Sequence, residues 1–143
     1  MLLFDVNVLV YAHKSGSEHH EEYLDWLNHV IEGPAPYGLS ELALSGFVRI
    51  VTHPRIFDQP SSLDEAFGFA NAIRSRDNAV ILRPGSRHWQ IFEDCCRGGR
   101  VRGSMVADAY HAALAIETGS TWVTADSGFA RFPGLDWRHP LSS

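Results

Sequence analysis

The chain has 143 residues, of which 45% are hydrophobic and 11% aromatic, and this composition is typical of one soluble globular domain spanning residues 1–143. A net charge of -5 argues against a protein that binds polyanions through excess positive charge. The apolar N-terminus is interrupted at Asp5 and has no basic residue before it, so we expect neither a signal peptide nor a membrane span, and a cytoplasmic protein. The only cysteines, Cys95 and Cys96, are adjacent, which predicts two reduced thiols rather than a disulfide or a zinc site.

The first eleven residues predict a buried strand that ends in a carboxylate. Residues 1–4 are apolar, and Val6, Val8 and Val10 are β-branched. A buried carboxylate without a partner is costly, so Asp5 needs a role. It either caps the turn or helix that follows or lies in the functional crevice beyond the carboxyl ends of parallel strands.

Strands and helices then alternate along the chain. Helices are predicted at residues 18–31, 41–51, 62–73, 86–96 and 105–118, and strands at residues 36–39, 78–82 and 121–125. Ser40 and Ser104 are placed to cap helices, a short turn or helix is expected at residues 128–132, and a last edge strand at residues 137–141. This alternation predicts an α/β fold with a central parallel sheet of four to five strands.

Four acidic residues fall at junctions between strands and helices. Asp5 and Asp126 follow strands, Glu41 opens a helix, and Asp108 lies near the start of another helix. In a parallel sheet these junctions share one edge, so the four carboxylates can converge. Each one alone also fits a helix cap or a favourable interaction with the helix dipole.

Converging carboxylates repel one another unless a cation joins them. A ligand set of carboxylate oxygens selects a hard ion such as Mg²⁺ or Mn²⁺. Such an ion supports hydrolysis at phosphate. The residue types therefore predict metal-dependent phosphodiester hydrolysis at this edge.

The basic residues bear on two questions, whether the chain is a phosphoacceptor domain and where it could contact RNA. Only Lys14 is a lysine among the 12 basic residues, and a phosphoacceptor or phosphatase-type domain needs a lysine near a late strand. Arg97, Arg100 and Arg102 lie in a segment at residues 97–103 that we expect to be flexible and without a partner charge nearby in sequence. These arginines are either a solvated loop or contacts to RNA phosphates.

Four short motifs resemble those of the PIN-domain ribonucleases, in matching order and spacing across nearly the whole chain. They are D-x-N-x-L at residues 5–9, S-E-L at residues 40–42, D-A-Y-H-A-A-L-A at residues 108–115 and T-x-D-x-x-F at residues 124–129. The chain length and the ending at residues 129–135 are most similar to the VapC toxins of type II toxin–antitoxin pairs. Each motif alone is weak, but four in register are specific.

The resemblance implies a three-layer α/β/α PIN-like domain and a divalent-metal-dependent endoribonuclease. It implies that Asp5, Glu41, Asp108 and Asp126 bind Mg²⁺ or Mn²⁺, and that Asn7 and Thr124 orient ligands or substrate. It also implies a VapB-type antitoxin as partner, and a toxin homodimer. Where many relatives carry a further acid before the phenylalanine, this chain has Gly128, which leaves the number of metal ions open.

A non-catalytic PIN-like module that uses the acids only to bind an antitoxin remains an alternative. The sequence gives no base preference for the RNA and does not determine the oligomer.

Overall fold

The computed structural model describes residues 1–142 and contains a five-stranded sheet in which every neighbouring pair is parallel. The strand order is β3-β2-β1-β4-β5. The strands are β1 (Leu2–Phe4), β2 (Tyr37–Ser40), β3 (Ala79–Leu82), β4 (Thr121–Val123) and β5 (Trp137–Arg138). The helices are α1 (Val6–His13), α2 (His20–Glu32), α3 (Glu41–Val51), α4 (Leu63–Arg74), α5 (His88–Gly99), α6 (Met105–Thr118) and the 3₁₀ helix η1 (Ser127–Arg131). The predicted α/β class and the parallel sheet are confirmed.

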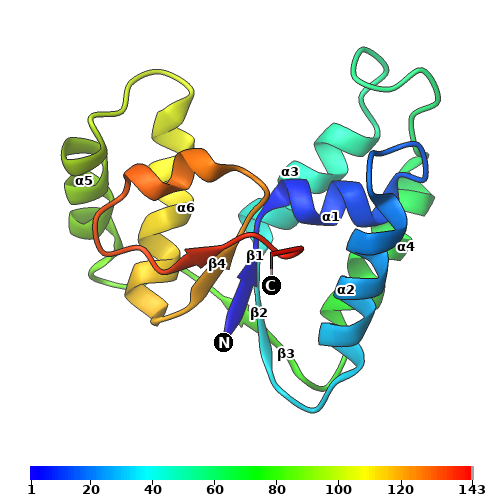
Figure 1. Cartoon of the computed structure of the whole chain (residues 1–143), viewed down its shortest axis with the longest axis horizontal. Helices are drawn as coiled ribbons and strands as arrows, with labels where there is room; N and C mark the ends of the chain where they lie inside the picture. The colour runs from blue at the N-terminus through cyan, green and yellow to red at the C-terminus, as the bar shows by residue number, and fades with distance from the viewer. Residues whose placement is uncertain (143) are drawn as a thin grey trace.

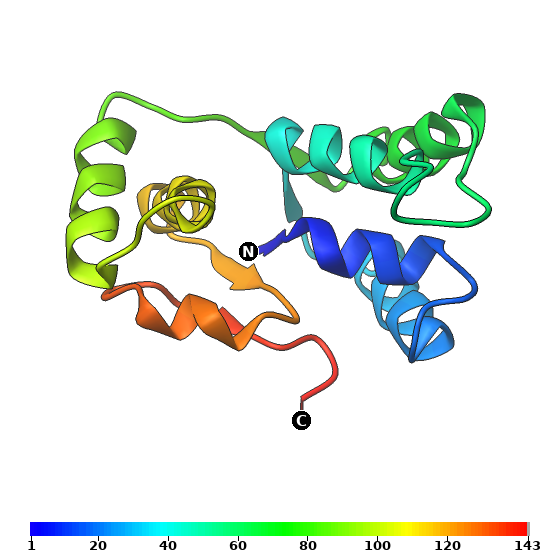
Figure 2. The same ribbon diagram turned by 90° about the horizontal axis from the view of Figure 1, so that it is seen from above.

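Helices cover both faces of the sheet and make three layers. Helices α1 to α4 lie on one side, and α5, α6 and η1 lie on the other (Figures 1 and 2). Side chains of a strand alternate between its faces. Accordingly Phe4 and Val123 join the core beneath α1 to α4, while Leu3 and Trp122 join the core beneath α5 and α6. Each short central strand therefore ties two separate cores together.

The first strand ends next to Asp5, as predicted, but the interpretation of Val6, Val8 and Val10 as strand residues is wrong, because helix α1 begins directly after Asp5. Asp5 keeps an extended backbone, and one of its carboxylate oxygens accepts the Val6 amide at 2.6 Å, which is an N-cap contact. Val8 and Val10 are buried in α1. Burial from several sides outweighs the modest preference of β-branched residues for strands.

The segment expected to be a flexible loop at residues 97–103 is partly helical. Arg97 lies in the last turn of α5, and its Nε donates to Glu93 one turn earlier at 2.9 Å. The expectation that this segment has no partner charge nearby is therefore wrong. Ser104 precedes α6 as predicted but makes no capping hydrogen bond through its side chain.

Most other boundaries fall close to the predicted ones. Helix α6 begins and ends at the predicted residues, and Ser40 caps α3 by accepting the Ala43 amide at 3.3 Å. Ser62 and Glu65 form a reciprocal capping box at the start of α4. The last strand is shorter than predicted, with two residues. Within residues 1–142, none of the helices is both long and apolar enough to cross a membrane.

Candidate active site

The sheet topology places two of the four predicted acids beside each other. The chain runs outward from β1 through β2 to β3 and then returns to the other side of β1 as β4. The strand order therefore reverses between β1 and β4, and the ligand crevice of an open α/β sheet lies at such a switch point. Asp5 directly follows β1, and Asp126 comes shortly after β4. The Asp5 amide also donates to the Val123 carbonyl at 2.9 Å, which extends the pairing of the two strands to this edge.

A hydrogen-bond network fixes the buried Asp5 side chain. Thr124 Oγ1 donates to Asp5 Oδ2 at 2.7 Å, and Asn7 Nδ2 lies 3.3 Å from the same oxygen. Asn7 Oδ1 in turn accepts the Ala125 amide at 3.2 Å, and Thr124 Oγ1 accepts the Asp126 amide at 3.0 Å. Asn7 and Thr124 thus join the loop after β4 to the start of α1 and hold the Asp5 carboxylate in place.

Three of the acids line one pocket of about 460 Å³. Asp108 reaches it from the first turn of α6, opposite Asp5 and Asp126, which arrive from the strand ends. Asp5 is buried, Asp108 is half-buried and Asp126 is exposed. The remaining lining residues come mainly from α1, α3 and the loop after α3 and include Asn7, Tyr11, Arg49, Ile50, Ile56, Phe57 and His111.

The electrostatics of the pocket confirm that these acids interact. The pKa of Asp5 is raised from 3.8 to about 6, chiefly by burial and to a smaller extent by the charges of Asp108 and Asp126, against the opposing hydrogen bonds from Thr124 and Val6. The pKa of Asp108 is also raised, first by burial and then by Asp126. A carboxyl group whose pKa is raised by burial and like charge, and which lines a pocket, is typical of a functional site.

Glu41 does not join this cluster in the structure. It is exposed at the first position of α3, is not among the residues that line the pocket of the three aspartates, and binds two arginines instead. Arg74 Nη2 contacts Glu41 Oε2 at 2.9 Å, and Arg83 Nη2 contacts Glu41 Oε1 at 3.2 Å. The hydrogen bond from Arg74, followed by smaller contributions that include Arg83, lowers the pKa of Glu41. Three of the four expected acids therefore line one pocket in this structure, and Glu41 does not.

Comparison with known proteins identifies the family. The PIN-domain family model matches residues 2–135. The chain belongs to the PIN-domain family.

Relatives of this PIN domain match over nearly the full chain. It is 43% identical over 141 residues to a ribonuclease named VapC43 of Mycobacterium tuberculosis, covering 99% of this chain and 96% of that protein. It is 34% identical over 140 residues to ribonuclease VapC37 of the same species, covering 98% of this chain and 97% of that protein.

Solved structures show the same fold at low sequence identity. A crystal structure of VapBC2 from Rickettsia felis, bound to a promoter DNA fragment, superposes with a TM-score of 0.71 at 17% identity over 96% of this chain and 97% of that chain. VapC20 of Mycobacterium tuberculosis, described as a toxin that cleaves the sarcin–ricin loop, superposes with a TM-score of 0.67 at 15% identity over 94% of this chain and 98% of that chain.

The predicted phosphate-binding arginines of this PIN domain lie outside the acidic pocket. Arg97, Arg100 and Arg102 are not among the residues that line it. Sequence reasoning missed two other arginines. Arg49 on α3 lines the pocket, and the charge of Arg131 at the end of η1 lowers the pKa of Asp108. Arg49 lies eight residues after Glu41 on α3, about 80° around the helix and outside the four motifs, so no feature of the sequence marked it.

The donor chemistry of the pocket fits a hard divalent cation. Its acidic side chains offer oxygen donors, and a cation would relieve the repulsion that adds to burial in raising the pKa values of Asp5 and Asp108. In residues 1–142 the structure contains no group of three or more His, Cys, Asp or Glu side chains already arranged to hold a metal ion. An incomplete carboxylate set suits Mg²⁺, which keeps several waters and binds through one or two carboxylates together with substrate phosphates.

Proposed function

We propose that this chain is the toxin of a type II toxin–antitoxin pair and an endoribonuclease that hydrolyses RNA phosphodiester bonds with Mg²⁺ or Mn²⁺. The observation that carries the proposal is the convergence of Asp5, Asp108 and Asp126 on one pocket at the topological switch point. The 43% identity to a protein named as a VapC ribonuclease supports RNA as the substrate.

In the proposed mechanism each acid has its own role. Asp5 and Asp108 hold the metal ion, and Asn7 and Thr124 keep the Asp5 carboxylate in place through the hydrogen bonds described above. Asp126, the most exposed of the three, accepts the proton of the attacking water. Glu41 serves as a further metal-binding acid once its arginine contacts are broken. When bound, a divalent ion stabilises negative charge on the phosphate and makes a water molecule easier to deprotonate.

In-line attack by water leaves a 5′-phosphate and a 3′-hydroxyl. Arg49 and Arg131 are the cationic side chains at this site and are proposed to contact the substrate phosphates. Contacts from Arg97, Arg100 and Arg102 stay a prediction, which their position outside the pocket does not support.

We further propose a VapB-type antitoxin as the cognate partner, a homodimer of the toxin, and a cytoplasmic location. The structures with the same fold from Rickettsia felis and Salmonella typhimurium are those of VapBC2 and VapBC bound to DNA. An antitoxin that places a cationic side chain among the three aspartates would compete with the metal ion for them.

Cleavage of total RNA by the purified chain tests this function. We expect cleavage that is abolished by EDTA, restored by Mg²⁺ or Mn²⁺ but not by Ca²⁺, and lost in Asp5→Asn and Asp108→Asn. Glu93→Gln is the matched control, because it removes one acidic charge from α5 outside the pocket and should cleave like wild type.

Two outcomes would contradict the proposal. Metal-independent cleavage that leaves 2′,3′-cyclic phosphates would exclude the metal-dependent mechanism. Growth arrest that persists in cells expressing Asp5→Ala and Asp108→Ala would favour the non-catalytic module.

A further inference from the structure

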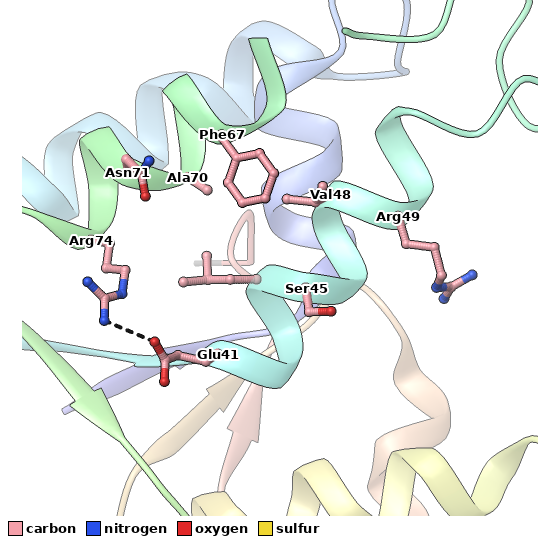
Figure 3. Close-up of a pocket in the computed structure, with 9 residues that line it drawn as sticks. Glu41, Ser45, Val48, Arg49, Phe67, Ala70, Asn71 and Arg74 are labelled. Carbon is pink, nitrogen blue, oxygen red and sulfur yellow. Dashed lines mark hydrogen bonds and ion pairs between the residues drawn. The ribbon is translucent and has the colours of Figure 1, made fainter. Parts of the chain in front are cut away.

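The contact between Glu41 and two arginines joins three separate segments of the chain. Arg74 belongs to the last turn of α4, and Arg83 follows β3, while Glu41 opens α3. Figure 3 shows Arg74 reaching across from α4 to Glu41, with the ring of Phe67 between the two helices. Two guanidinium groups that converge on one carboxylate form a site for a small oxyanion group.

The ion pairs are too exposed to hold Glu41 firmly. The side chains of Glu41, Arg74 and Arg83 are 48%, 42% and 65% exposed. Solvent screens exposed ion pairs of this kind and makes them weak, so another anion can replace the carboxylate. The Glu41 carboxylate is therefore free to leave the two arginines when a stronger anionic ligand arrives.

The surface around Glu41 adjoins the acidic pocket on two sides. Glu41 lines one pocket of about 520 Å³ between α3 and α4 and another of about 420 Å³ that includes Arg83. The first shares Arg49 with the pocket of the three aspartates, and the second shares His111 with it. An RNA strand bound at Arg74 and Arg83 therefore lies next to the proposed catalytic acids.

The charge balance of this surface differs from that of the whole chain. Glu41 lines both of these pockets, and the other charged residues in their lining are Arg49, Arg74 and Arg83. Once the Glu41 carboxylate leaves, three arginines remain without an acid in this lining, although the chain carries a net charge of -5. The exposed Phe67 ring and the Asn71 amide of the same lining suit an unpaired nucleotide beside its phosphate.

We propose that Arg74 and Arg83 form a binding site for a phosphate of single-stranded RNA, which the Glu41 carboxylate occupies in the free protein. Binding of RNA displaces Glu41 and frees it to act as the fourth acid of the site. This inference rests on the proposed function, because it takes RNA as the substrate.

RNA binding without cleavage tests the proposal. A short fluorescent single-stranded RNA of mixed sequence is titrated with the full chain in EDTA at low salt, where phosphate contacts dominate affinity. Arg74→Gln with Arg83→Gln should weaken binding by roughly tenfold, the value expected for losing charge-assisted hydrogen bonds. Glu41→Gln should tighten binding several-fold, because the competing carboxylate is gone.

Two comparisons separate this competition from a general charge effect. In the background of Arg74→Gln and Arg83→Gln, the substitution Glu41→Gln should no longer tighten binding. Glu21→Gln removes the same charge from an exposed position of α2 that lines none of these pockets, and should leave binding nearly unchanged. Circular dichroism verifies that all variants fold.

Three results would overturn the proposal. The first is a gain from Glu41→Gln that persists without the two arginines, or that Glu21→Gln matches. The second is tighter binding of a polyglutamate peptide, but not of RNA, by Glu41→Gln, which would assign the arginines to an acidic protein partner. The third is an RNA affinity that Glu41→Gln does not change, in a chain whose cleavage still needs Asp5 and Asp108. This result would reject the phosphate site at Arg74 and Arg83 and leave the proposed function intact.

Discussion

The two oxygens of Asp5 serve different neighbours. Oδ1 accepts the Val6 amide and caps α1, whereas Oδ2 accepts the Thr124 hydroxyl and faces the network at the strand ends. The two sequence interpretations of this residue, helix cap and pocket carboxylate, therefore both apply. One side chain ends β1, starts α1 and lines the acidic pocket.

Thr124 stabilises this arrangement, and its hydroxyl is the group to remove. Thr124→Val keeps the shape of the fully buried side chain but leaves Asp5 without its closest side-chain donor. We expect a loss of about 1–3 kcal/mol in the free energy of unfolding and a pKa of Asp5 above its present value of about 6. Urea denaturation and NMR titration of the Asp5 carboxyl group measure the two effects. Thr124→Ser retains the donor, and equal losses in both variants would contradict the role of the hydroxyl.

The half-buried His111 ring should make the folded protein less stable as the pH falls. It stacks on Trp122 with ring centroids 5.3 Å apart, and burial lowers its pKa from 6.5 to about 4. Above pH 6.5 the ring is neutral in both the folded and unfolded states. As the pH falls towards 4, the unfolded chain takes up a proton that the folded chain does not, so stability falls by up to about 3 kcal/mol.

The variant His111→Phe keeps an aromatic ring against Trp122 and removes the titration. Its free energy of unfolding relative to wild type should rise as the pH falls from 6.5 to 4 and stay constant above pH 6.5. Thermal or urea denaturation across this range measures the difference. A difference that does not change with pH would show that His111 titrates normally in the folded protein.

At the scale of elements, helix boundaries follow packing more than local preference. Helix α1 contains several β-branched residues and still forms, because helices α2 and α3 and the sheet bury it. Helix α5 continues through Gly98 and Gly99, which predict a loop, because both lie against the chain after η1. A Cβ on Gly98 would approach Pro133, and one on Gly99 would approach Phe132. The two glycines allow this close packing.

Replacing two helical glycines by alanine should have opposite effects. A Cβ at Gly99 would lie 3.0 Å from two ring carbons of the buried Phe132, so Gly99→Ala should destabilise the chain by about 1–3 kcal/mol. A Cβ at the exposed Gly68 in α4 meets nothing within 4 Å, so Gly68→Ala should stabilise it by about 0.5–1 kcal/mol. Thermal denaturation compares the two. Stabilisation by both would mean that α5 and the chain after η1 do not pack as described.

At the scale of the whole molecule, the strand order creates the site. Two cores, one on each face of the sheet, hold β1 and β4 side by side. The carboxyl ends of these two strands bring together residues from opposite ends of the sequence. Asp5 and Thr124, which are hydrogen-bonded there, are 119 positions apart along the chain. Asp108 reaches the same pocket because α6 packs against α5 on the face opposite α1.

A divalent ion that binds the folded pocket should stabilise the entire domain. At a free concentration about 100 times its dissociation constant, such an ion adds about 2.7 kcal/mol to the free energy of unfolding. We therefore expect Mn²⁺ to raise the melting temperature of wild type and of Glu93→Gln, and to have little effect on Asp108→Asn. Differential scanning fluorimetry measures this shift. An equal shift in Asp108→Asn would place the ion elsewhere.

Periodicity and junction residues in the sequence were sufficient for the class of fold and for the shared pocket of three acids, whose catalytic role stays a prediction. Alternation of strands and helices requires parallel pairing, and parallel pairing puts Asp5, Asp108 and Asp126 at one edge whatever the details of packing. The start of α1 and the end of α5 were not predictable in this way. They depend on which surfaces the rest of the chain provides for Val8, Val10, Gly98 and Gly99.

The position of the Glu41 carboxylate was decided by tertiary structure alone. Its two partners lie 33 and 42 positions further along the chain, on a helix and after a strand that meet only in the folded protein. The sequence places Glu41 at the correct junction, but the rotamer of an exposed side chain follows the nearest opposite charges. Local sequence fixes where a residue enters the edge of the sheet, and only packing fixes which neighbour its charged group meets.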